Sequence, residues 1–259
     1  MGSYREIVNF NFKVLQYVGL WALKTNNEFH KSLYFIYQYF VMIVYISFIL
    51  LSWVDLYTIR KNFEIFNLNL LGLISFTLHM IKFNIALYKL PDINRLRKEM
   101  IQSAEKEMDE DCKKIIMKTA KEMKILSRAI YLVMYGTVAF WCLAPFLDFK
   151  EGERKLPVRQ WFPFDNQASP NYELIYVFQI FIFNWIVTEW AGTDSIILVF
   201  MIGLSSEYEI LERKIGKLNE LYGNEILEDE EMAKFIREIA VYHQEIISCV
   251  FSGVQRKNF

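Results

Sequence analysis

The sequence predicts an all-α membrane protein, a bundle of four transmembrane helices with a cytosolic N-terminus. Three observations lead to this fold class. The 259 residues are 54% hydrophobic and 17% aromatic, and their charged residues gather in separate blocks. Four apolar runs are long enough, at about 1.5 Å per residue, to cross a hydrocarbon core of about 30 Å. Lysine and arginine are distributed unequally among the connecting segments, which indicates the sidedness.

The chain begins with an amphipathic segment, residues 1–31. This pattern fits a helix lying at the membrane interface or an ordinary soluble helix that packs on its neighbours. The first transmembrane helix is predicted at 32–54, since Ser32–Val54 contains no charged residue. Tyrosines near its start and Trp53 near its end suit the two membrane interfaces.

The second transmembrane helix is predicted at 65–88. Its basic side chains are His79 and Lys82, and Lys82 lies close enough to the helix end to extend to the lipid headgroups. We expect His79 to be either a buried, hydrogen-bonded helix residue or a proton switch. The charged stretch 89–128 follows as a cytosolic helical link with a solvated face.

The third transmembrane helix is predicted at 129–147, where Gly136 permits a close helix approach and Pro145 ends the helix. An extracellular loop, 148–172, leads to the fourth transmembrane helix at 173–204. The two acids inside its apolar run, Glu189 and Asp194, are expected to face protein or water or to lie close to the inner boundary, because a lone carboxylate in lipid is costly.

The last segment, 205–259, is predicted to be cytosolic and helical, with breaks at Gly216 and Gly223. Counted as far as Glu245, the segments assigned to the cytosol contain 20 lysine and arginine residues, against 6 in the two links on the other side. Positive residues accumulate on the cytosolic side of membrane proteins. The N-terminus is therefore expected inside, and the loop around Trp161 outside.

Motifs for soluble chemistry are missing from the sequence. There is no nucleotide-binding loop, nucleophile elbow or zinc-protease motif, and the three cysteines lack metal-site spacing. The net charge of −1 gives no reason to expect a nucleic acid partner. We therefore expect neither an enzyme nor a cofactor. An intramembrane hydrolase or proton carrier that uses His79, Glu189 and Asp194 stays open as an alternative.

The loop before the fourth helix resembles the pattern found at that place in insect odorant receptors. The residues that carry the resemblance are Leu156, Pro157, Trp161, Pro163, Phe164 and Asp165 in the loop, Gln179, Gly192 and Asp194 in the fourth helix, and His243 and Gln244 near the end. Val18-Gly19-Leu20-Trp21 and Lys82 also fit. These pieces follow the family's order and spacing, and they extend along nearly the whole chain.

This resemblance implies an inverted-topology bundle of seven helices, of which four lie within these 259 residues, the chain stopping before helix 5. It implies a tuning subunit in the plasma membrane of olfactory sensory neurons, surrounded by membrane lipid. With a co-receptor subunit it would form a hetero-tetrameric cation channel opened by a small, volatile, hydrophobic odorant. A four-helix membrane adaptor or assembly subunit without a ligand is the alternative.

The odorant would bind in the outer half of the bundle. The candidate ligand-binding residues are Phe76, His79, Tyr135, Val138, Ala139, Ile180, Phe181 and Asn184. An aromatic, apolar pocket with a few polar groups suits small volatile molecules. Each of these residues could instead serve only helix–helix packing, and Trp161 and Phe164 could form a lid or simply order the loop.

Overall fold

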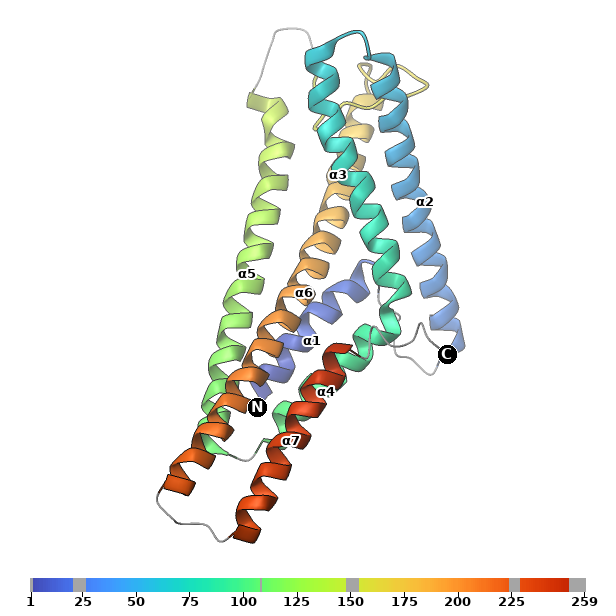
Figure 1. Cartoon of the computed structure of the whole chain (residues 1–259). Helices are drawn as coiled ribbons and strands as arrows, with labels where there is room; N and C mark the ends of the chain where they lie inside the picture. The colour runs from blue at the N-terminus through green and yellow to red at the C-terminus, as the bar shows by residue number, and fades with distance from the viewer. Residues whose placement is uncertain (1, 21–26, 108, 148–153, 224–228, 252–259) are drawn as a thin grey trace. The chain divides into compact units, whose positions relative to one another are not determined.

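A computed structural model describes residues 2–20, 27–107, 109–147, 154–223 and 229–251. These residues form seven helices and no strand (Figure 1). The helices are α1 (Gly2–Tyr17), α2 (Glu28–Thr58), α3 (Phe63–Tyr88), α4 (Leu90–Lys106), α5 (Glu110–Leu147), α6 (Asn171–Gly223) and α7 (Asp229–Phe251). The all-α prediction is confirmed for the described residues.

Four helices, α2, α3, α5 and α6, are long and apolar enough to cross a membrane. They contain the four predicted spans. Two of the helices extend well beyond those spans. α5 runs unbroken from its acidic start at Glu110 through the predicted boundary at 128, and α6 continues into the charged segment after 204. The described part of the loop predicted to be extracellular, 154–170, has no regular secondary structure.

Three local predictions about glycine and proline were wrong. Gly216 does not break α6, which continues to Gly223; a single glycine costs a helix only about 1 kcal/mol. Pro145 lies inside α5, two residues before its end at Leu147. No described atom lies within 4 Å of a Cβ built on Gly136, whereas one built on Gly192 would lie 2.6 Å from Leu15 Cδ2.

The charged stretch 89–128 is helical, as predicted, and is made of α4 and the first part of α5. Pro91 lies in the first turn of α4, where proline is tolerated, and α4 ends at Lys106. Asp109 then starts α5: its carboxylate accepts the backbone N–H groups of Asp111 at 2.8 Å and Cys112 at 3.3 Å. This side-chain cap satisfies donors that an isolated helix start leaves open.

The chain divides into two compact units. One unit contains residues 1–10, 89–128 and 195–259, and the other contains 11–88 and 129–194. The second unit has the apolar halves of the long helices, and α2 and α3 pack side by side in it (Figure 1). Its core comprises Tyr45, Phe48, Ile49, Leu56, Ile59, Leu73, Ile182, Phe183 and Ile186.

The end of α1 is fixed within the second unit. Gly19, with φ of +85°, turns the chain after the helix. Three aromatic side chains then donate to the carbonyls that the helix end leaves open: Tyr34 Oη to Gln16, Tyr37 Oη to Tyr17, and Trp185 Nε1 to Val18, at 2.8–3.0 Å. This explains the Val18-Gly19-Leu20 part of the predicted motif; Trp21 lies outside the described residues.

Candidate functional site

An aromatic cluster lies among α2, α3 and α6 in the second unit. The ring of Phe48 meets Phe76 edge to face, with centroids 5.4 Å apart, and meets Phe183 in the same way at 5.8 Å. Phe76 and Phe183 lie almost parallel at 6.2 Å, and Trp190 tilts against Phe76 at 6.2 Å. Such arrangements match the preferred geometries of aromatic pairs. We call these four residues the aromatic cluster.

A buried polar pair borders the aromatic cluster. His79 Nε2 of α3 faces Glu189 Oε2 of α6, and the two side chains are 4% and 0% exposed. Thr193 Oγ1 donates to the other carboxylate oxygen at 2.8 Å. The imidazole also packs against Trp190, with centroids 4.7 Å apart. Glu189 therefore faces protein, as predicted, and His79 is a buried residue in contact with an acidic partner.

A second acid–base pair joins the same helices. Lys82 of α3 contacts Asp194 of α6, and each side chain is 38% exposed. The expectation that Lys82 extends to the headgroups stays a prediction; in the structure its ammonium group contacts a carboxylate, which is a favourable partner for it. Glu189 and Asp194 thus both have basic partners on α3.

The candidate ligand-binding residues fall into two groups. Phe76 belongs to the aromatic cluster, His79 packs on it, and Val138 packs against the same core. Tyr135 Oη shares a hydrogen bond of 2.5 Å with Thr188 Oγ1. The other candidates are separate from this group in the described residues: Ile180 is half-buried, and Ala139, Phe181 and Asn184 are exposed. The amide of Asn184 donates to the Ile180 carbonyl of its own helix.

The loop residues of the predicted motif surround a buried glutamine that sequence reasoning did not select. Leu156 and Pro157 are half-buried, whereas Trp161, Pro163, Phe164 and Asp165 are exposed. Gln160 between them is 2% exposed and bonds to Gln179 Nε2, Phe48 O and Ser52 Oγ. A glutamine in a polar loop gives no sequence signal for burial, so only the structure reveals it.

The remaining motif residues have plainer surroundings. Gly192 is buried where Leu15 approaches α6. His243 and Gln244 are exposed on α7. For the loop, Asp165 Oδ1 accepts the backbone N–H of Gln167 at 2.9 Å, and its own carbonyl accepts from the Asn171 amide. These contacts fix the turn that leads into α6.

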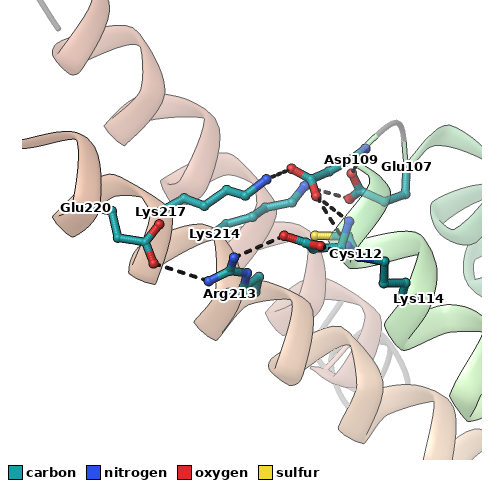
Figure 2. Close-up of polar contacts among 9 residues, drawn as sticks. Glu107, Asp109, Cys112, Lys114, Arg213, Lys214, Lys217 and Glu220 are labelled. Atoms are coloured by element: carbon teal, nitrogen blue, oxygen red, sulfur yellow. Dashed lines mark hydrogen bonds and ion pairs between the residues drawn. The ribbon is translucent and has the colours of Figure 1, made fainter. Parts of the chain in front are cut away.

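Ion pairs hold α6 to the α4–α5 connection in the first unit (Figure 2). The pairs are Lys214 with Glu107 at 2.8 Å, Arg213 with Asp111 at 3.0 Å, and Lys217 with Asp109. The hydrogen bond from Lys217 holds the pKa of Asp109 below its usual range, helped by the two backbone N–H groups that the carboxylate accepts. These pairs explain why charge continues along α6 past Gly216.

A groove of about 510 Å³ also lies in the first unit, lined by residues of α4, α6 and α7. Glu207 is one of its polar lining residues and accepts from Ser103 Oγ at 3.0 Å and from Tyr242 Oη. Burial, together with the negative charge of Glu207, raises the pKa of the Tyr242 phenol. None of the candidate ligand-binding residues lines this groove.

Comparisons with known proteins identify the family. A family model described as 7tm Odorant receptor matches residues 62–252. No curated protein sequence matches. Two solved structures of the insect olfactory receptor OR5 from Machilis hrabei have a similar fold. The one in complex with eugenol is 15% identical with a TM-score of 0.71, and the match covers 95% of this chain and 65% of that receptor. The other is 17% identical, with a TM-score of 0.75 and coverage of 96% and 66%.

The chain therefore spans slightly less than two thirds of the receptor chains that it matches. At these identities the structural likeness supports the fold alone. The family model covers most of the chain, and four helices suit a multi-pass membrane protein. The description of the matching family is that of a receptor and not of an enzyme. The chain belongs to the insect odorant receptor family.

Proposed function

We propose that this protein is the tuning subunit of an odorant-gated cation channel. It binds a small, volatile, hydrophobic molecule in the outer half of its helix bundle, assembles with a co-receptor subunit into a hetero-tetramer, and acts in the plasma membrane of olfactory sensory neurons. Family membership supports this role, as does the positive charge bias that assigns the N-terminus to the cytosol.

The single observation that carries the proposal is the aromatic cluster of the second unit. Phe76 and its neighbours Phe48, Phe183 and Trp190 offer aromatic faces from three different helices. Burying apolar ligand surface is worth about 25 cal/mol per Å², so a small odorant gains affinity mainly from contact area. The His79–Glu189 pair supplies polar groups next to that surface.

Binding would act by shifting a conformational equilibrium. A ligand changes the balance between closed and open states only by its differential affinity for the two. Because the cluster joins three helices, an odorant that fits it better when those helices are slightly displaced would favour the displaced state. The buried cluster and its polar border make such a response dependent on ligand shape.

The test is to express the whole receptor, with any residues that follow Phe259, together with a co-receptor and to record odorant-evoked currents. The panel starts with eugenol, the ligand in one related structure, and extends to esters, ketones, alcohols and terpenes. Phe76→Ala should raise the half-maximal odorant concentration at least about tenfold, the equivalent of roughly 1.4 kcal/mol of lost burial. Phe40→Ala is the matched control, since Phe40 is 62% exposed on α2.

The expected result is an odorant response that Phe76→Ala weakens and Phe40→Ala preserves. Surface biotinylation of all variants confirms that they reach the membrane. Silence of the unsubstituted receptor across the panel, at normal surface levels, would reject the receptor role and favour a ligand-free adaptor. Equal responses of the two alanine variants would reject the aromatic cluster as the ligand site.

A further inference from the structure

Gln160 is a loop residue with the surroundings of a core residue. Its side chain is 2% exposed, and each polar atom of its amide has a partner. Nε2 donates to the Phe48 carbonyl at 3.0 Å and to Ser52 Oγ at 2.9 Å, both on α2. Oε1 accepts from Gln179 Nε2 of α6 at 3.0 Å. One amide thus bridges two membrane helices from the outer loop.

Gln179 completes this connection on the side of α6. It is fully buried, and its amide pairs with the backbone of Val158: Nε2 donates to the Val158 carbonyl at 2.8 Å, and Oε1 accepts the Val158 N–H at 3.1 Å. Buried hydrogen bonds of this kind are expensive to leave unmade. We call Gln160 and Gln179 the glutamine brace.

The glutamine brace contacts α2 and α6, two of the helices that carry the aromatic cluster. Phe48, whose carbonyl receives Gln160, places its ring against Phe76 and Phe183. Gln179 precedes Phe183 by one helical turn on α6, so the two lie on the same helix face. A molecule that enters between these rings has to displace α2 or α6, and the brace fixes both helices to the loop.

We propose that Gln160 is a positioning residue that couples the outer loop to the aromatic cluster and thereby sets how tightly the receptor holds its odorant. The inference rests on the proposed function. With the brace intact, the loop keeps α2 and α6 at the spacing that fits the ligand; with the brace broken, the ligand site widens and the odorant leaves faster.

A second polar contact of the loop reaches α2 but not α6. Arg159 contacts Asp55 of α2 at 3.2 Å, with the arginine side chain 52% exposed and that of Asp55 7% exposed. Gln167 is an exposed glutamine of the same loop, with its amide donating to the Arg154 carbonyl at 3.1 Å. It is the matched control for Gln160.

The experiment compares Gln160→Glu with Gln167→Glu in the whole receptor expressed with its co-receptor. Glutamate keeps the shape of glutamine but loses both N–H donors. The first readout is the rate at which a membrane-impermeant maleimide labels Val158→Cys, which reports loop docking without any odorant. The second is the half-maximal concentration and current decay after washout for the most potent odorant of the panel, eugenol being tested first.

For Gln160→Glu we expect labelling about fivefold faster or more, a half-maximal concentration about fivefold higher or more, and faster decay, as for a typical coupling between sites. Gln167→Glu should stay within about twofold of the unsubstituted receptor on both readouts. Should Gln160→Glu fail to reach the surface, Gln160→Asn, shorter by one methylene, should shift both readouts in the same direction.

Three results would overturn the inference. Unchanged labelling means that Gln160 does not hold the loop. Faster labelling with an unchanged odorant response means that the loop is held but does not act on the ligand site. An unsubstituted receptor that reaches the surface and answers no odorant rejects the proposed function, and the coupling to odorant affinity with it.

Discussion

Replacing Glu189 by leucine should destabilise the protein far more than an equivalent change elsewhere on α6. Glu189 is fully buried and faces His79, which is itself buried. Leucine leaves the imidazole without its acceptor, whereas Thr193 still donates to the Glu189 backbone carbonyl at 2.9 Å. The cost is about 1–3 kcal/mol if a neutral imidazole loses its hydrogen bond, and about 3–5 kcal/mol if a charged pair is broken.

The matched control is Glu173→Leu on the same helix. Glu173 is 53% exposed and pairs with the half-exposed Arg154 at 3.0 Å, so its loss should cost no more than about 1 kcal/mol. The double variant His79→Leu with Glu189→Leu should recover much of the stability, because replacing both partners of a buried pair by apolar groups leaves no orphaned group.

The assay is thermal unfolding of the purified whole receptor in lipid nanodiscs, followed by fluorescence-detected gel filtration. A loss of about 3 kcal/mol corresponds to a fall in Tm of roughly 6–12 °C for a domain of 150–250 residues. Equal Tm values for Glu189→Leu and Glu173→Leu would refute the reasoning. So would a double variant that is less stable than Glu189→Leu alone.

Two further predictions concern packing and charge. Gly192→Ala should cost about 1–3 kcal/mol, because the new Cβ would lie 2.6 Å from Leu15 Cδ2. Gly136→Ala, with open space among the described residues, should be neutral or stabilising. Nanodisc melting curves in which both variants lose the same stability would contradict this. Asp109→Asn should cost at most about 1 kcal/mol at neutral pH, because Lys217 holds the pKa of this half-buried carboxylate low. Since the folded pKa is the lower one, this contribution is present above the ordinary carboxyl pKa and is lost as the pH falls through the lowered value. The Tm difference between Asp109→Asn and the unsubstituted receptor should therefore vanish between about pH 7 and about pH 3, and a difference that persists at low pH would have another origin.

The membrane helices could be predicted because hydropathy is a property of contiguous residues. An uncharged run such as Ser32–Val54 predicts a membrane-spanning helix, whichever other helix it packs against. Helix ends were harder to locate. Gly216 lies between residues whose side chains take part in ion pairs, so tertiary contacts hold the helix across it. Asp109 interrupts the charged stretch by capping a new helix. The sequence does not indicate which acid of an acidic run will be the cap.

Pairings between distant residues could not be predicted. Lys82 and Asp194 are separated by 112 positions, and helical periodicity does not say which faces of two helices meet. Gln160 was missed for the same reason, since its burial depends on Phe48 and Gln179 from two other elements. Among the candidate ligand-binding residues, Phe76 lies in the aromatic cluster, His79 packs on it and Val138 packs against the same core. Topology could not reveal that Phe181 is exposed in the described chain.

The most direct test of odorant binding at the aromatic cluster is ligand quenching of tryptophan fluorescence. Trp190 lies in that cluster, against Phe76 and His79. The purified whole receptor is titrated with the odorant that activates it, alongside Trp190→Phe. We expect saturable quenching at concentrations that match the current response, and loss of most of that quenching in Trp190→Phe. Quenching that never saturates, or that is the same in both proteins, would contradict binding at this cluster.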